Sequence, residues 1–278
     1  MKTQAFVPLV THPEANSDAI GAHAAAMASY LGAGIHALAV NANIPKVSNA
    51  LSRMLLDTPE LIRQAEAASR ERGNQLLAVL KEKAEAAGVE FTQEIVSAPL
   101  PMMADVAGEH ARYYDFSLVG WEAGNITSQA TAEAVVFGSG RPTILLPELV
   151  DISAIDHVAI AWDGSRVAAR AVADAQAFLK RADRVSVLTV VDEKPLKEKA
   201  AHERLASALR QRGIEAEAVS IRGQDCPVAQ TLQETAIERD CQLLVMGGYG
   251  HSRLRDFVLG GATQGVLFNL LVPVLLSH

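Results

Sequence analysis

The chain has 278 residues, of which 49% are hydrophobic and 21% charged, and its formal net charge at pH 7 is −7. These values are typical of a soluble globular protein with room for two domains of about 140 residues. Because Lys and Arg form no cluster and no apolar run reaches the roughly 18–20 residues of a membrane helix, we expect neither a nucleic-acid nor a membrane partner.

The first half of the chain predicts strands and helices in alternation. Short β-rich or alternating runs indicate strands, and apolar residues at helical spacing indicate helices. The predicted strands are 4–10, 34–42, 89–97, 114–121 and 141–147, and the predicted helices are 17–33, 58–87, 99–112 and 128–137.

The second half repeats this order of elements. Strands that alternate with helices favour parallel pairing with right-handed crossovers. The predicted strands are 157–163, 184–192, 214–223, 241–247 and 272–277, and the predicted helices are 165–182, 197–213, 227–240 and 257–271.

The two halves also match at their ends. RYYDFSLVGW corresponds to ERDCQLLVMGG, and SGRPTILLP corresponds to NLLVPVLLS. We interpret this as an internal duplication, with one domain at 1–150 and the other at 151–278. Each is predicted to be an α/β domain of Rossmann-like type, an open and mostly parallel five-stranded sheet with helices on both faces. The final strands, 143–147 and 272–277, are the candidates for the seam of an internal pseudo-dimer.

A glycine-rich segment follows the fourth strand of the second half. Gly247 and Gly250 are separated by two residues, Gly260 comes after nine more, and Gly261 and Thr263 follow. In open parallel sheets, ligands bind beyond the carboxyl ends of the strands, where glycines let backbone N–H groups approach phosphate oxygens. The segment therefore predicts a phosphate-binding loop, and a purely structural turn is the alternative.

Asp163 ends the first strand of the same half and faces the same edge. Its carboxylate would accept hydrogen bonds from a ribose or adenine, or else Asp163 or Ser165 would cap the following helix. The corresponding place of the loop in the first half holds Trp121 and Glu122, and a carboxylate there would repel phosphate. We therefore expect the first half to bind no nucleotide in the same way.

Other chemistry finds little support in the sequence. No Walker A motif, Gly-x-Ser-x-Gly elbow or metal-ligand spacing of histidines is present, so we expect no catalytic residues and no metal site. Cys226 and Cys241 lie in no CxxC arrangement, and the N-terminus has no signal-peptide pattern. Both features favour the cytoplasm.

The run from Val245 to Val266 resembles the nucleotide-binding signature of the universal stress protein family, in which Gly, two residues, Gly, nine residues and Gly are followed by Ser or Thr. The strands AIAWDGS and VLTVVDEKP look like that family's first two strands. The resemblance covers the second half in full and the first half in outline. It implies tandem domains of the adenine nucleotide hydrolase-like fold.

The resemblance also implies ATP or a related adenine nucleotide, with or without Mg²⁺, in the second domain. Asp163 would lie near the nucleoside, Val190 would meet adenine through its main chain, and the loop glycines would contact ribose and phosphates. Gly261 stands where the family usually has Ser or Thr, and Thr263 is the nearest hydroxyl. The implied binding residues are Asp163, Val190, Met246, Gly247, Gly250, Gly260, Gly261 and Thr263.

The function implied is a regulatory stress-response protein that binds the nucleotide without using it as a substrate. Two alternatives stay open: an interaction scaffold of the same fold that needs no nucleotide, and a slow ATPase. Whether two chains pair into a homodimer is also open.

Overall fold

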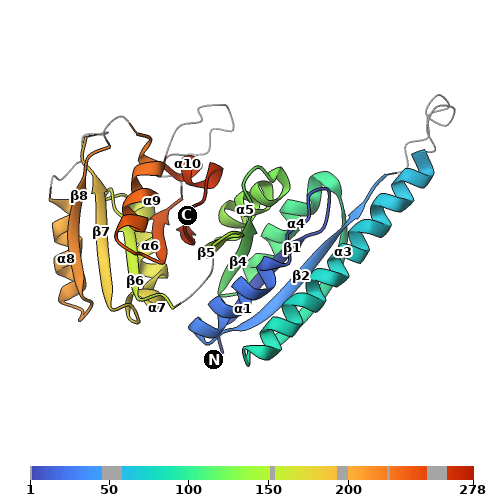
Figure 1. The fold of residues 1–278 in the computed structure, drawn as a ribbon, viewed down its shortest axis with the longest axis horizontal. Helices are drawn as coiled ribbons and strands as arrows, with labels where there is room; N and C mark the ends of the chain where they lie inside the picture. The colour runs from blue at the N-terminus through green and yellow to red at the C-terminus, as the bar shows by residue number, and fades with distance from the viewer. Residues whose placement is uncertain (1, 46–57, 151–153, 193–199, 224–225, 249–261) are drawn as a thin grey trace. The chain divides into compact units, whose positions relative to one another are not determined.

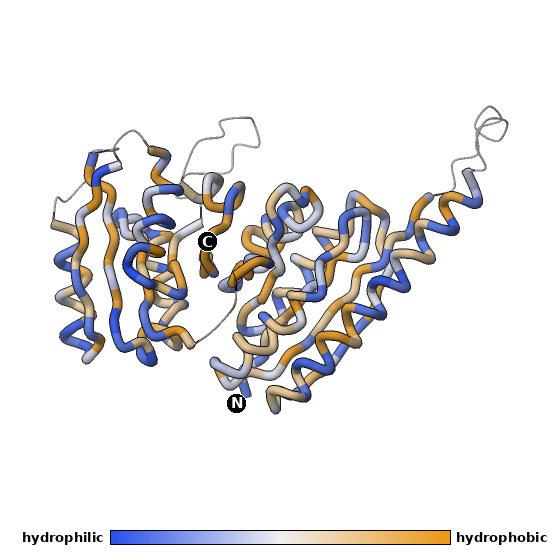
Figure 2. The backbone as a smooth tube through the Cα atoms, viewed as in Figure 1, coloured by the Kyte–Doolittle hydropathy of each residue, from blue (hydrophilic) through white to orange (hydrophobic). Residues whose placement is uncertain are grey.

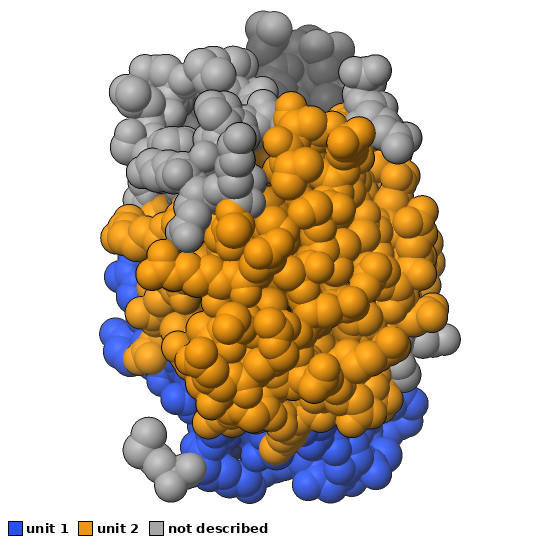
Figure 3. All heavy atoms as spheres, turned by 90° about the vertical axis from the view of Figure 1, so that its left-hand side faces the viewer, with its two compact units in different colours: residues 1–139 blue, residues 140–278 orange. Residues whose placement is uncertain are grey.

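The computed structural model describes residues 2–45, 58–150, 154–192, 200–223, 226–248 and 262–278. The chain divides into two compact units, residues 1–139 and residues 140–278 (Figure 3). We describe each unit by itself.

The first unit is a parallel sheet of strand order β3-β2-β1-β4, covered on both faces by helices (Figure 1). Helices α1 and α3 pack against each other over the sheet, and α4 and α5 form the other pair. Its elements are β1 (Gln4–Val10), α1 (Ala19–Leu31), β2 (Gly34–Asn43), α3 (Thr58–Ala86), β3 (Phe91–Pro99), the 3-10 turn Leu100–Met102, α4 (Met103–His110), the 3-10 turn Ala111–Tyr113, β4 (Phe116–Trp121) and α5 (Ile126–Gly138).

The second unit has the strand order β5-β10-β9-β6-β7-β8, in which every pair is parallel except β5 with β10. Helix α6 packs over β9 and β10 and α8 over β7 and β8, whereas α9 and α10 pack against each other. Its elements are β5 (Thr143–Pro147), β6 (His157–Ala161), α6 (Arg166–Asp174), α7 (Gln176–Leu179), β7 (Arg184–Val190), α8 (Ala201–Arg210), β8 (Ala216–Ile221), α9 (Val228–Glu238), β9 (Leu243–Gly247), α10 (Ala262–Phe268) and β10 (Val274–Ser277).

The central strands are hydrophobic along their whole length because helices bury both of their faces. All five residues of β6 are buried, as are the last six of β1, and the strands are mostly orange in Figure 2. Continuous apolar runs of this kind are expected of parallel strands covered on both sides. The structure therefore confirms the α/β class and the predicted order of strands and helices.

Two details differ from the sequence prediction. The helix expected over 165–182 is divided at Ala175, where the backbone ψ angle of 4° separates α6 from α7. The domain limit expected near residue 150 lies beyond the contact boundary between residues 139 and 140, so β5 groups with the second unit. Strand β5 pairs antiparallel with β10, with Leu145 opposite Val274.

Candidate functional site

The end of β6 in the second unit is fixed by side chains that hold the following turn. The Thr189 hydroxyl, on β7, donates to the Trp162 carbonyl at 2.6 Å. The Asp163 carboxylate accepts from the Ser165 amide at 2.8 Å, and the Ser165 hydroxyl accepts from the Ala168 amide at 3.2 Å. Ser165 is thus the N-cap of α6, and Asp163 supports that cap from an exposed position at the carboxyl edge of the sheet. Asp163 and Ser165 therefore cap α6, which is one of the two roles that the sequence suggests for them.

The peptide groups of Val190 face the space beyond the end of β6. On one side of β7, the Leu188 carbonyl accepts from the Trp162 amide at 2.8 Å; on the other, the Val191 amide donates to the Ile221 carbonyl of β8 at 3.0 Å. Because successive residues of a strand direct their N–H and C=O groups to alternate sides, those of Val190 point toward the β6 side. At that level β6 has already ended, so among the described residues this main-chain donor and acceptor face no strand partner.

A second carboxylate joins the ends of β7 and β8. Asp192 accepts from the Gly223 amide through both oxygens, at 2.9 and 3.0 Å. The Gly223 carbonyl in turn accepts from the Cys226 amide at 2.8 Å, just before α9. The carboxylate therefore holds the two strand ends together beside Val190.

Gly247, at the end of β9, is required by packing. A Cβ atom built there would stand 2.6 Å from the Ala168 amide nitrogen and 2.6 Å from the Val167 carbonyl carbon, both in the first turn of α6. No side chain tolerates such distances, so glycine allows α6 to lie directly on the strand end. The next amide, of Gly248, donates to the Ser277 carbonyl of β10 at 2.7 Å. Of the glycine-rich loop, the structure describes only the start, which this packing and this hydrogen bond hold in place.

The remaining predicted binding residues are described only in part. Gly250, Gly260 and Gly261 lie outside the described residues. Thr263 belongs to α10, which begins one residue earlier. Met246 is 3% exposed within β9, so its side chain belongs to the core. The structure thus brings Asp163, Val190 and Gly247 to one edge of one sheet.

The corresponding edge of the first unit is occupied by the protein's own carboxylates. Glu122 accepts from the Ser17 amide at 2.8 Å and from the Asn125 side-chain amide at 3.0 Å. Glu14 accepts from the Ile126 amide at 3.1 Å. Sequence reasoning identified Glu122 but missed Asn125, three residues later, and Glu14, which reaches this edge only through the fold.

A small apolar cavity is also present in the first unit. It has room for about one water, which is far below the size of a nucleotide. Pro8, Leu9, Val10, Val40, Met103, Ala107, Thr127 and Thr131 line it.

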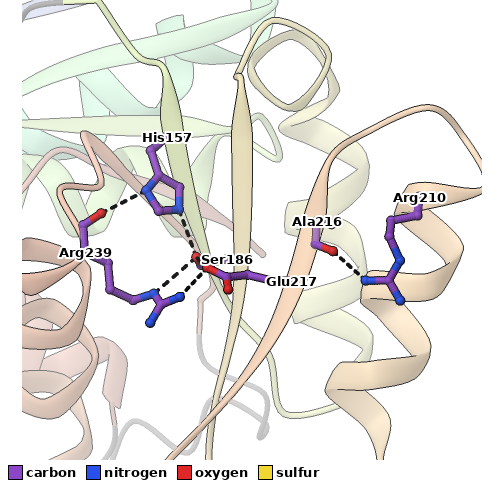
Figure 4. A network of polar contacts seen from close by, with 6 residues as sticks. All are labelled: His157, Ser186, Arg210, Ala216, Glu217 and Arg239. Carbon is purple, nitrogen blue, oxygen red and sulfur yellow. Dashed lines mark hydrogen bonds and ion pairs between the residues drawn. The ribbon is translucent and has the colours of Figure 1, made fainter.

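A serine and a histidine meet at the opposite, amino-terminal end of the second unit's sheet (Figure 4). His157 Nε2 lies 2.8 Å from Ser186 Oγ, and His157 Nδ1 lies 2.9 Å from the Arg239 carbonyl oxygen. Ser186 also contacts Glu217 Oε1 at 2.8 Å, and the Arg239 guanidinium pairs with the same carboxylate. In the sequence, this contact is marked only by one polar residue in each of two mostly apolar strands.

The geometry of this cluster is unsuited to nucleophilic catalysis. Ser186 is fully buried and His157 is 3% exposed, so no substrate reaches the hydroxyl. In a catalytic triad the carboxylate orients the histidine, whereas here Glu217 contacts the serine and a backbone carbonyl holds the imidazole. Burial lowers the pKa of His157, and the charges of Arg184 and Arg239 lower it further against the opposing effects of the Arg239 carbonyl and Glu217. Arg239 holds the pKa of Glu217 below its usual value.

No three His, Cys, Asp or Glu side chains in the described part of the chain gather closely enough to hold a metal ion. Within the same residues, no helix combines the length and the apolar character needed to cross a membrane.

The second unit is similar in sequence to a known protein family. Residues 154–278 match the model of the universal stress protein family. A universal stress protein from Archaeoglobus fulgidus superposes with a TM-score of 0.72 at 19% sequence identity, and the match covers 98% of this chain and 97% of that one. A protein of unknown function from Pseudomonas aeruginosa gives a TM-score of 0.56 at 13% identity, covering 98% and 92%. No curated protein matches the chain significantly.

The family match and the structural match agree on the architecture of the chain. At these identities the solved structures show a shared fold, which extends over both units, while the family model identifies the second unit and supports a role in the stress response. Residues 154–278 therefore belong to the universal stress protein family, and they follow a first unit of similar fold, as in a tandem member of that family.

Proposed function

We propose that the second unit binds ATP or a related adenine nucleotide at the carboxyl edge of its sheet and serves a regulatory role in the stress response. The observation that carries the proposal is the direction of the Val190 peptide groups, which face the space beyond the end of β6. A main-chain donor and acceptor at this position suit the edge of an adenine ring. Ligands of open parallel sheets bind at this edge.

The neighbouring residues fit a nucleoside in charge and exposure. Asp163 is exposed and uses one carboxylate oxygen on the Ser165 amide, and a ribose offers hydroxyl donors to a carboxylate. Asp192 and Gly223 hold the strand ends on the far side of Val190. The phosphates would meet the loop that begins at Gly247.

A regulatory role agrees with what the described residues offer chemically. The serine–histidine contact between Ser186 and His157 is buried at the other end of the sheet, and the site edge brings an aspartate near the nucleoside without a partnered nucleophile among the described side chains. We therefore propose that bound nucleotide changes the conformation or association of the unit and is not consumed.

Calorimetric titration of the full chain with ATP, with and without Mg²⁺, tests the proposal. Asp163→Asn keeps the oxygen that caps the Ser165 amide and removes the charge, so it separates binding from folding. Loss of one charged hydrogen bond should weaken binding by roughly 10-fold or more. Asp183→Asn, an exposed aspartate at the opposite edge of the same sheet, is the matched control and should bind as the parent does.

The result that overturns the proposal is the absence of binding heat at high ATP concentration. That result would favour an interaction scaffold that needs no nucleotide. Release of phosphate above a blank without protein, abolished by Asp163→Asn, would instead show an ATPase.

A further inference from the structure

The first unit exchanges two carboxylates across the edge of its sheet. Glu14 lies in the segment between β1 and α1, yet its carboxylate binds the Ile126 amide at the first residue of α5. Glu122 lies between β4 and α5, yet its carboxylate binds the Ser17 amide just before α1. Each segment thus supplies the anion at the start of the other segment's helix.

Asn125 holds the two segments together at the centre of this exchange. Its side-chain amide donates to the Glu122 carboxylate at 3.0 Å and to the Glu14 backbone carbonyl at 3.2 Å. Its side-chain oxygen accepts from the Ser128 amide at 2.9 Å, which makes it the N-cap of α5. The residue is 7% exposed; its bond to the Ser128 amide is buried, and its bonds to Glu122 and Glu14 are partly buried.

Physical chemistry explains why negative groups are stable at these positions. A helix N-terminus presents N–H groups without intrahelical partners and carries the positive end of the helix dipole. Both α1 and α5 have 13 residues, long enough for the full effect. In folds of this class, such helix starts at the carboxyl edge are where phosphate groups bind.

In the second unit, the amide at the start of the corresponding helix is bound by a carboxylate from its own segment. The Ser165 amide, at the start of α6, is bound by Asp163 two residues earlier in the chain. No carboxylate from a distant segment is seen at this helix start among the described contacts, whereas Glu122 reaches Ser17 across 105 positions of sequence. The exchange is therefore a feature of the first unit as described.

We propose that Glu14 and Glu122 are built-in anions that take the place of a ligand's phosphates. They fix the β1–α1 and β4–α5 segments to each other without a bound nucleotide. The inference rests on the proposed function for its comparison with the second unit. It extends that function to the stoichiometry: the chain binds one nucleotide, in the second unit.

Fluorescence separates the two units in the test, because each contains one of the chain's two tryptophans. In a Trp162→Phe background, Trp121 reports the first unit alone, and it lies directly before Glu122. Glu122→Ala should lower the urea midpoint of this signal by roughly 1 M through the loss of two charge-assisted hydrogen bonds. Glu109→Ala removes an equal charge from an exposed position on α4 and should leave the midpoint unchanged.

Chemical rescue tests whether the position is an anion site. Sodium acetate has the size of the group that Glu122→Ala removes, and sodium phosphate tests the larger anion; sodium chloride at equal ionic strength is the reference. Either anion should raise the midpoint of Glu122→Ala above the chloride value by more than it raises the midpoint of the parent or of Glu109→Ala. No rescue by acetate or phosphate, or an equal shift in all three proteins, overturns the proposal.

Two further outcomes are decisive. Glu122→Gln has the same shape without the charge, and its amide group faces the amide of Asn125, so its midpoint should also fall. A Gln variant as stable as the parent would overturn the role of charge. ATP calorimetry should give one nucleotide per chain: two per chain overturns the built-in anions, whereas none overturns the proposed function and leaves the rescue experiment to decide this inference.

Discussion

The buried imidazole of His157 lies between a carbonyl, which only accepts hydrogen bonds, and a hydroxyl, which holds one proton. Three contacts form a chain: Arg239 carbonyl to Nδ1, Nε2 to Ser186 Oγ, and Ser186 Oγ to Glu217. Each needs its own proton, but a neutral imidazole and a hydroxyl supply two. A third proton would complete the chain, yet burial opposes its charge and keeps the pKa of His157 below the usual 6.5.

The direction of the pH effect follows from this lowered pKa. As the pH falls through 6.5, the histidine of the unfolded chain takes up a proton while the folded one does not. The contribution of His157 to stability is therefore complete above 6.5 and is lost as the pH falls toward the folded pKa. The largest loss is about 1.4 kcal/mol per pH unit, the linkage value for one proton.

Urea unfolding of the second unit measures this slope. In a Trp121→Phe background, the fluorescence of Trp162 follows the second unit, and the free energy of unfolding is compared from about pH 7.5 to about pH 5.5. His157→Gln should be less stable at every pH, since it breaks the network, but its free energy should fall less steeply toward acid.

Two results would refute the reasoning. One is an equal slope in the parent and in His157→Gln. The other is a proton magnetic resonance titration in which the His157 ring protonates above pH 6.5.

Three further predictions concern single side chains. Gly247→Ala should destabilise the second unit by roughly 1–3 kcal/mol, seen in the urea midpoint, because its Cβ would stand 2.6 Å from the Ala168 nitrogen; an unchanged midpoint would contradict this packing. With Ellman's reagent, one thiol should react in the folded protein and two in urea, because Cys226 is exposed while burial raises the pKa of Cys241 to about 12. Burial also lowers the pKa of His36, so His36→Gln should flatten the acid-side loss of stability in the first unit, and a slope equal to the parent's would count against it.

Local sequence patterns were sufficient for most of the secondary structure. The helix expected over 58–87 is α3, Thr58–Ala86, and the strand expected over 4–10 is β1, Gln4–Val10. Both depend on periodicity within one segment, which a sequence displays directly. The division of α6 from α7 at Ala175 was not predictable, because nothing in the local sequence breaks the helical spacing there.

The strand ends that form the candidate site were predictable from the sequence, whereas the contacts that hold them were not. Asp163 and Gly247 were identified because each lies at or just after the end of a strand, whereas Val190 was identified only through the resemblance to the universal stress protein family. The reason for Gly247 is the approach of α6, a contact between segments far apart in sequence. Glu14 was missed for the same reason, although Asn125 and Ser128 at the start of α5 form a cap pattern that points to this segment.

The antiparallel pairing of β5 with β10 has a consequence for how the protein is made. During synthesis β5 leaves the ribosome before the rest of the second unit, and its partner β10 follows as that unit's last strand. All five residues of β5 are buried in the finished structure. Until β10 arrives, this short apolar segment has an unpaired edge of the kind that promotes aggregation. Chaperones that shield nascent chains would therefore be needed most while the second unit is being translated.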